Sequence, residues 1–339
     1  MSVGRLLENM VKYSQVRPYK FKAYMKETLW GGNRIAPFKG ITSTSSNIGE
    51  SWEISGVPGH ESVVAANGGA DDADVGLSLP GLIDKYGVDL VGERVYRAFG
   101  NKFPLLVKFI DARQDLSIQV HPNDELARKR HGCAGKTEMW YVVAAQPGAK
   151  VYSGLRRSLT PAEFEQLVAL ASSGNVFEDV ISAHDSHEGS AFFLPAGRIH
   201  AIGAGNFLAE IQQTSDITYR IYDFGRKGAD GKSRELHTAL AKDAIDYRVL
   251  PEADYCVRYD ASKPRVELVR CDYFRVCRVE VETAAHLDLK TDSFVILVCL
   301  KGAAEVNGVS VRQGETLLVP ALDNVMEIAG AATFLTATA

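Results

Sequence analysis

The sequence lacks the features of a secreted, membrane-spanning or disulfide-stabilised protein. Its five cysteines are odd in number and show no CxxC spacing, which favours reduced thiols in a cytosolic protein. The N-terminal segment MSVGRLLENMVKYSQVRPYKFK has no apolar run of the kind found in signal peptides. The longest apolar run, Phe294 to Leu300, is far too short to span a bilayer. We therefore expect no membrane partner and a cytoplasmic location.

The chain also has no block of basic residues. Its 38 Lys and Arg residues and 42 Asp and Glu residues give a net charge of −4, which argues against a nucleic-acid partner. A mildly acidic protein that binds a phosphorylated metabolite must concentrate a few cations locally. With 339 residues, 46% hydrophobic and 24% charged, the chain is large enough for two globular domains, or for one large β-fold with additions.

The sequence predicts mainly short strands separated by tight turns. Strand-like runs include Pro104–Ala112 and most of the chain after Pro264. Asn307-Gly308, between two valine-containing runs, is a strong hairpin signal. In IGESWEISG, regular alternation would place Trp52 and Ile54 on one strand face. Many short strands at this spacing favour an all-β sandwich or jelly roll.

Helical patterns are confined to three short insertions, at about residues 77–100, 160–173 and 234–246. In the second insertion, Thr160 is a predicted N-cap, because proline follows at the first helical position and glutamate at the third. Residues 1–20 are expected to form a leading helix or an arm. The helical portion of the protein is therefore small.

The strongest chemical signal is a set of four possible metal ligands. Because side chains alternate along a strand, Gln119 and His121 in SIQVHPNDELA point to the same side, with apolar residues behind them. Glu138, which begins the run EMWYVV, can add a carboxylate, and His200, in LPAGRIHAIGAG, a second imidazole. Such a mixed set suits zinc or a neighbouring first-row metal inside a β-barrel. From spacing alone, a polar surface pair at Gln119 and His121 is the alternative.

Two segments repeat one pattern. GSAFFLPAGRIHAIG and, near the C-terminus, GETLLVPALDNVMEI each contain a glycine, a short apolar run, Pro-Ala and a returning strand. The first copy contains His200, whereas the second has Asn324 at the comparable place and no histidine nearby. We interpret this as two related β-barrels in tandem, a metal-binding one over residues 21–262 and a degenerate one over residues 263–339.

Four motifs, in the order QVHPNDELA, GKTEMWY, PAGRIHAIGAG and EIQQTSDITYRIYDFGR, resemble those of the class I mannose-6-phosphate isomerases in their shorter bacterial form. The resemblance covers the greater part of the chain, from LWGGNRI to RELH, and the C-terminal β region also fits. It implies a mainly β fold with two cupin-like jelly-roll barrels. It also implies a zinc-dependent aldose–ketose isomerase that interconverts mannose 6-phosphate and fructose 6-phosphate through an enediol or enediolate. One Zn²⁺ per chain would be bound by Gln119, His121, Glu138 and His200.

The resemblance implies a catalytic role for Arg220 and a place in the wall of the substrate pocket for Glu210. Arg220 matches the catalytic arginine and could hold an enediolate oxygen or the phosphate. From the residues alone, an ion pair with Asp216 or Asp223 is the alternative. Glu210 is a candidate either for proton transfer or for orienting a ligand or Arg220. Metal-bound water is a third candidate base.

Lys136, Lys108 and Ser117 match positions that line the substrate pocket in the family. Lys136 shares a strand face with Glu138, so it could bind substrate oxygens, assist ring opening or simply form a salt bridge. Lys108 and Ser117 are candidates for binding the phosphate, which prefers cations and hydroxyl donors.

The other histidines carry weaker signals. His184 and His187 are spaced i, i+3 in SAHDSHEG, but this segment is predicted to be an exposed loop. His237, in RELH, is a candidate for supporting the site from outside it. None of these residues is predicted to bind the metal.

Two other functions are weighed against the isomerase. A cupin oxygenase or another metal enzyme would commonly use two or three histidines with a carboxylate, and the Gln119/His121 pair and the Glu210–Arg220 segment argue against it. A non-enzymatic sugar-binding cupin would be favoured by loss of a ligand or of Arg220, yet all these residues are present. The expected partner is a small sugar phosphate, and the expected state is a monomer or a weak homo-oligomer.

Overall fold

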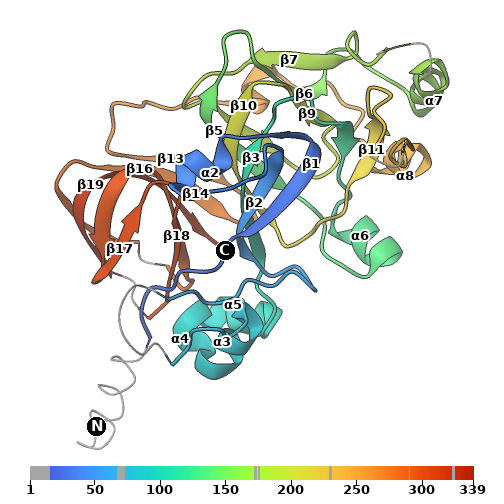
Figure 1. The fold of residues 1–339 in the computed structure, drawn as a ribbon. Helices are drawn as coiled ribbons and strands as arrows, with labels where there is room; N and C mark the ends of the chain where they lie inside the picture. Colours follow the sequence, from blue (N-terminus) through green and yellow to red (C-terminus); the bar gives the residue numbers. More distant parts are fainter. Residues whose placement is uncertain are drawn as a thin grey trace, which may run out of the picture.

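The computed structural model describes residues 16–66, 73–171, 174, 176–228, 231–289, 291–322 and 325–339. Residues 1–15 of the predicted arm and Asn324 lie outside these ranges. As predicted, the described chain is mainly β, and its three sheets are antiparallel. Figure 1 shows two β bodies beside each other with short helices at the periphery. None of the helices described is long and apolar enough to cross a membrane.

Two sheets form the first barrel. In spatial order, the larger sheet contains β1 (Tyr24–Gly32), β2 (Ile48–Ser55), β3 (Leu105–Asp111), β10 (Asn206–Gln213), β5 (Glu138–Ala145), β8 (Ala191–Leu194) and β12 (Cys256–Val257). The smaller sheet contains β11 (Tyr219–Tyr222), β4 (Ile118–Val120), β9 (His200–Ile202), β6 (Lys150–Leu155) and β7 (Ile181–Asp185). Strands distant in sequence, such as β3 and β10, are therefore direct neighbours.

The third sheet forms the C-terminal barrel. It contains β13 (Arg265–Arg270), β14 (Arg275–Val281), β19 (Val325–Thr338), β16 (Val295–Val306) and β17 (Val309–Arg312), with β15 (Ala284–Asp288) paired to β19 and β18 (Thr316–Val319) paired to β16. The predicted hairpin is confirmed. β16 and β17 are joined by Asn307 and Gly308, whose φ angles of 45° and 81° are those of a type I′ turn.

A shared apolar core joins the two barrels and explains why Phe294–Leu300 is apolar at every position. Leu297 and Cys299 of β16 lie in the core of the C-terminal barrel, whereas Ile296 and Val298 point the other way and pack against the larger sheet. A strand buried on both faces needs apolar residues at every position. The predicted division of the chain into domains stays a prediction.

The same alternation places polar residues inside the first barrel. Val107 and Phe109 of β3 lie in the shared core, so Lys108 between them points to the opposite face. Glu210 of β10 is directly opposite Lys108 and therefore shares its face. Glu138 of β5 also lies on this face, through the β10–β5 register. The larger sheet thus turns its apolar face to the second barrel and its polar face inward.

Short helices surround the barrels: α2 (Ile35–Lys39), α3 (Leu79–Tyr86), α4 (Val88–Val91), α5 (Glu93–Phe99), α6 (Asp124–His131), α7 (Pro161–Leu170), α8 (Thr238–Ala244) and a 3₁₀ turn (Glu252–Asp254). Helix α7 begins as predicted, since the Glu163 amide donates to Thr160 Oγ1 at 3.2 Å. Helices α3, α4 and α5 end at Gly87, Gly92 and Gly100, which all have positive φ. Helices α2 and α6 lie outside the three predicted insertions.

Candidate metal centre and active-site cavity

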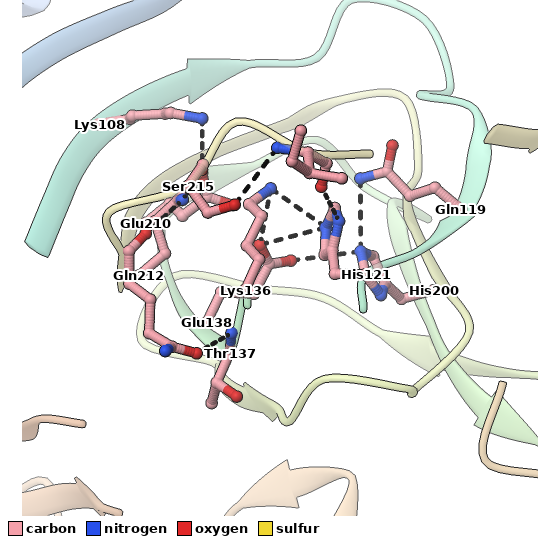
Figure 2. Close-up of polar contacts among 12 residues, drawn as sticks. Lys108, Gln119, His121, Lys136, Thr137, Glu138, His200, Glu210, Gln212 and Ser215 are labelled. Carbon is pink, nitrogen blue, oxygen red and sulfur yellow. Dashed lines mark hydrogen bonds and ion pairs between the residues drawn. The ribbon is translucent and has the colours of Figure 1, made fainter. Parts of the chain in front are cut away.

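Three of the predicted metal ligands meet inside the first barrel. His121 follows β4, Glu138 begins β5 and His200 begins β9, so both sheets contribute. All three are buried, and their ligand atoms lie within 4.8 Å of one another. His200 Nε2 is 3.2 Å from Glu138 Oε1, and His121 Nε2 is 3.4 Å from Glu138 Oε2. Figure 2 shows both imidazoles directed at the carboxylate.

Backbone carbonyls set the tautomer of both imidazoles. His121 Nδ1 lies 2.9 Å from the Ile217 oxygen, and His200 Nδ1 lies 2.8 Å from the Arg198 oxygen. Because a carbonyl can only accept, each Nδ1 carries the proton and each Nε2 presents its lone pair to Glu138. Burial lowers the pKa of both imidazoles, to about 3 for His121, so both are neutral at neutral pH.

This donor set fits a divalent cation. Both carboxylate oxygens of Glu138 are buried, and neither has a hydrogen-bond partner. Burial opposes ionisation of this carboxyl, but the Lys136 ammonium holds the pKa of Glu138 well below its usual range. Neither Nε2 carries a proton, so both imidazoles turn a lone pair toward the ionised Glu138 carboxylate. The Lys136 ammonium offsets part of the resulting repulsion, and a divalent cation among these atoms would turn it into coordination.

Gln119 lies beside the cluster on the neighbouring strand. It is paired with His200 across β4 and β9, and its Nε2 lies 3.3 Å from His200 Nε2. Its Oε1 accepts a hydrogen bond from Ser117 Oγ at 3.2 Å. The amide nitrogen, not the oxygen expected of a ligand, is therefore nearest to the cluster. A half-turn of the amide about its last torsion would exchange the two atoms.

A cavity of about 350 Å³ opens next to these residues, a volume typical of small-ligand sites. Its wall contains six of the predicted site residues: Lys108, Ser117, Gln119, Lys136, Glu210 and Arg220. It also contains polar residues that were not predicted to line it: Lys26, Thr28, Glu50, Asp216, Thr218 and Arg234. Lys26 and Thr28 are two residues apart, as are Asp216, Thr218 and Arg220, so the alternation of a strand could have grouped them.

Lys136 connects the cavity with the metal-ligand cluster. Its Nζ lies 3.0 Å from Glu138 Oε2 and 3.1 Å from His121 Nε2 (Figure 2). The contact with Glu138 is an ion pair without hydrogen-bond geometry, since that oxygen has no hydrogen-bond partner. The salt bridge considered from the sequence is therefore formed. The same side chain also lines the cavity, so the salt bridge does not exclude contact with a ligand.

Lys108 is held between two carboxylates. Its Nζ lies 3.3 Å from Glu210 Oε2 and 3.5 Å from Glu50 Oε2, and it sits 4.9 Å from the centre of the Trp52 ring. Burial opposes its charge, but the two carboxylates outweigh burial and raise the pKa of Lys108. Because this ammonium is already balanced, the environment does not favour its predicted role as a phosphate ligand.

Glu210 is a buried carboxyl at the cavity wall. Its Oε1 accepts a hydrogen bond from Trp140 Nε1 at 2.8 Å, and the Trp140 ring packs edge-on against His200 at 5.3 Å. Burial and the charge of Glu138 raise the pKa of Glu210. Within the described chain its polar contacts are Trp140 and Lys108, so it does not directly orient a metal ligand or Arg220. A raised pKa suits a group that accepts and returns a proton near neutral pH.

Arg220 lines the cavity as an incompletely satisfied guanidinium. It is paired with Gln119 across β11 and β4, so the two side chains share a face. Its Nη1 donates to the Glu235 backbone oxygen at 2.8 Å, whereas its Nε is buried without a hydrogen-bond partner. This leaves part of the group available to a bound anion.

Neither acidic residue considered as a partner binds Arg220 in the part of the chain described. Asp223 is occupied by two other arginines, and Asp216 lies 3.9 Å from Lys26. Burial, followed by the positive charge of Arg234, lowers the pKa of Arg220. The structural ion pair weighed against the catalytic role is therefore not formed.

The other histidines named from the sequence are structural. His237 donates its backbone N–H to the Arg220 oxygen at 2.7 Å, and its Nδ1 accepts the Arg220 backbone N–H at 3.2 Å, which anchors β11 from outside the cavity. His187 is exposed as predicted. The prediction was wrong for His184, which is buried on β7 with its Nε2 3.1 Å from the Ser153 oxygen. The pairing of β7 with β6 turns this segment into sheet.

Comparisons with known proteins agree with this architecture. Residues 19–142 match the family model of the phosphomannose isomerase type I catalytic domain. Mannose-6-phosphate isomerase ManA of Bacillus subtilis is 34% identical over 313 residues, which cover 89% of this chain and 93% of that protein. A mannose-6-phosphate isomerase of Streptococcus mutans is 30% identical over 89% of this chain and 92% of its own length.

A solved structure extends the similarity to three dimensions. The crystal structure of the mannose 6-phosphate isomerase from Bacillus subtilis superposes with a TM-score of 0.81 and 27% identity, over 95% of this chain and 99% of that one. The predicted fold class, mainly β with two cupin-like barrels in tandem and a small helical portion, is confirmed. On this evidence of sequence and fold, the chain belongs to the type I phosphomannose isomerase family.

Proposed function

We propose that this chain is a zinc-dependent aldose–ketose isomerase that interconverts D-mannose 6-phosphate and D-fructose 6-phosphate through an enediol or enediolate. The observation that carries the proposal is the buried cluster of His121, Glu138 and His200 beside a cavity of about 350 Å³. Family membership supports the same substrates, since the similar curated proteins are named mannose-6-phosphate isomerases.

Gln119, His121, Glu138 and His200 would hold one zinc ion per chain. Imidazole and carboxylate donors are common in zinc sites, and the two Nε2 lone pairs already face the carboxylate. Zinc would supply polarisation of the substrate's carbonyl and hydroxyl oxygens and stabilise negative charge that develops on them. The remaining chemistry falls to the residues of the cavity wall.

Glu210 is the proposed proton carrier. Its carboxylate removes the proton from C2 of the open-chain aldose, the C2–H electron pair forms the C1–C2 double bond, and the C1 oxygen takes the negative charge. The protonated Glu210 then returns the proton to C1, while the hydroxyl proton passes from the C2 oxygen to the C1 oxygen and leaves a carbonyl at C2. A raised pKa keeps both transfers accessible near neutral pH.

Arg220, Lys136 and Ser117 would position the substrate and stabilise its charge. The Arg220 guanidinium shares a face with Gln119 and would bind the enediolate oxygen, an interaction that strengthens as negative charge develops. Lys136 would contact substrate oxygens and assist ring opening from its place between the cavity and Glu138. Ser117 now donates to Gln119 Oε1, and once that oxygen turns to the zinc ion its hydroxyl would donate to the substrate.

The metal requirement gives a direct test. We expect the purified protein to contain one zinc ion per chain and to form fructose 6-phosphate from mannose 6-phosphate in a coupled assay. Chelation should abolish turnover, and added zinc should restore it. Full turnover by metal-free protein would contradict the proposal. Iron content with oxygen consumption would support a cupin oxygenase instead, and sugar binding without turnover would support a binding protein.

The role of Glu210 is tested by Glu210→Gln. If Glu210 carries the proton, kcat should fall by about 10²–10⁴-fold while zinc content stays unchanged. Because the folded-state pKa of Glu210 is raised, wild-type kcat should decline on the acid side at a pH above the ordinary range of a glutamate, and the variant should lose this decline. Near-normal kcat in the variant would assign the proton to another group.

Lys108→Gln provides the matched control for that pH profile. The Lys108 ammonium favours the ionised form of Glu210, so its removal should raise the pKa of Glu210 further. The acid limb of kcat is therefore expected to move to higher pH, with the limb still present. An unchanged limb would show that Glu210 does not set it.

A cytoplasmic location and a monomeric or weakly associating state complete the proposal. All five cysteines are free thiols, as in proteins of a reducing compartment. The net charge of −4, without a basic block, supports a small-molecule partner and no nucleic acid.

A further inference from the structure

Two arginines pair with one carboxylate near a third arginine, Arg220, at the edge of the cavity. Arg226 and Arg234 both form ion pairs with Asp223, and the charge of each acts on Arg220. The carboxylate of Glu235 is 83% exposed, so it offsets little of this charge. Three guanidinium groups against one buried carboxylate leave a surplus of two positive charges in this part of the structure. Like charges crowded in this way favour a bound anion.

Arg234 and Arg226 differ in which of their N–H donors remain without a partner among the described residues. Arg234 lines the cavity, and its Nε and Nη2 donate to the two oxygens of Asp223, the first at 2.7 Å. Its Nη1 makes no hydrogen bond with the described residues. Arg226 lies outside the cavity wall and uses Nε and Nη2 on Asp223 and Nη1 on the Asp115 backbone oxygen. Of these two arginines, Arg234 is therefore the one that combines a fixed orientation, an open donor and a place in the cavity.

The lysines of the cavity do not compete for this role, because each faces carboxylates. The pairs are Lys26 with Glu50 and Asp216, Lys108 with Glu50 and Glu210, and Lys136 with Glu138. The positive charge that carboxylates do not balance one to one therefore lies at Arg220, which has no ion pair with the described residues, and at Arg234, which shares Asp223 with Arg226. A phosphate dianion, which prefers guanidinium donors, is the part of a sugar phosphate that best matches it.

We propose that Arg234 binds the phosphate group of the substrate and that Asp223 acts as a positioning residue for its guanidinium. This inference rests on the proposed function, which supplies a phosphorylated sugar. Arg220 is paired with Gln119 across β11 and β4, and it lines the same cavity as Arg234. The reacting C1–C2 end of the sugar would then face Gln119 and Glu210.

Arg234→Ala tests the assignment. We expect KM for mannose 6-phosphate to rise by about 10–100-fold, the loss typical of a charge-assisted hydrogen-bonded contact, with kcat little changed. The inhibition constant of inorganic phosphate and the dissociation constant of mannose 6-phosphate, measured by calorimetric titration, should rise by a similar factor. Zinc content should not change. Arg234→Lys should recover part of the binding, and it carries the test if the alanine variant does not fold.

Arg226→Ala is the matched control, because it removes the other partner of Asp223 from outside the cavity. It is expected to lower the melting temperature without weakening phosphate binding. Equal weakening in both alanine variants, or normal binding in Arg234→Ala, would overturn the assignment. Calorimetric binding does not need turnover, so a wild-type chain that binds mannose 6-phosphate through Arg234 without isomerising it would refute the proposed function and still support the phosphate site.

Discussion

His200→Ala is expected to yield a folded protein that binds no stoichiometric zinc and forms no measurable fructose 6-phosphate. His200 directs its Nε2 at Glu138 from 3.2 Å, and its Nδ1 is anchored on the Arg198 oxygen, so no nearby group can replace it. Loss of a ligand should exceed the roughly 10–100-fold loss of metal affinity typical of removing an outer partner. Elemental analysis and the coupled assay on the same preparation measure both effects.

His184→Ala controls for the removal of a buried imidazole. His184 contacts the Ser153 oxygen on β7 and lies outside the metal-ligand cluster. This variant is expected to lose stability, read as a lower melting temperature, while it keeps its zinc and most of its kcat. Stoichiometric zinc and normal turnover in His200→Ala would refute the ligand assignment.

Arg220→Ala is expected to separate metal binding from catalysis. The variant should keep zinc and fold, because Arg220 has no ligand role and β11 is held by backbone hydrogen bonds to His237. Its kcat should fall by about 10²–10³-fold, the effect of removing one donor that stabilises an oxyanion. Single-turnover assays with zinc analysis test both parts of the expectation.

Arg220→Lys tests the geometry of the same group. The lysine keeps a positive charge but not the planar set of donors, so it should recover only part of the lost kcat. Loss of zinc in Arg220→Ala would show that the arginine supports the metal site instead. A fall in melting temperature with unchanged kcat would return it to a structural role.

Strand alternation explains why two of the candidate metal ligands could be grouped from the sequence. A two-residue period puts Gln119 and His121 on one side of a strand without any knowledge of the fold. The place of His200 beside Gln119 was harder to predict, because β4 and β9 are distant in the sequence and meet only in the folded sheet. For Arg220 and Glu210 the family motifs supplied roles that spacing alone left open.

An irregularity in β2 explains why the alternation of side chains there was predicted incorrectly. The register between β2 and β3 shifts between Trp52 and Ile54, so the two residues do not share a face. Ile54 enters the shared core, whereas Trp52 packs with Leu106 and lies beside Lys108. The prediction of a common face was therefore wrong. A bulge of this kind has no signature in the residues SWEIS, yet it delivers an aromatic ring to the site.

The pairing of charged side chains was the other property that could not be predicted from the sequence. Glu50 neutralises Lys108 only because β2 and β3 are neighbours, and Asp223 is occupied only because its two arginines come from loops that fold back on it. Arg226 lies only three residues from Asp223, but the pairs Glu50–Lys108 and Asp223–Arg234 do not follow from sequence distance. Which cations carry charge that the nearby carboxylates do not fully balance can be seen only once all of these side chains have been placed.

Because the two barrels pack against each other, the C-terminal barrel helps to hold the proposed catalytic residues of the first barrel in place. Among the described residues, none that lines the cavity comes from the C-terminal barrel. Val107 and Phe109, on either side of Lys108, nevertheless pack in the apolar core that the two barrels share. Any sliding of one barrel over the other would shift the ammonium that faces Glu210. The C-terminal barrel thus supports the strands of the larger sheet that carry the proposed catalytic groups.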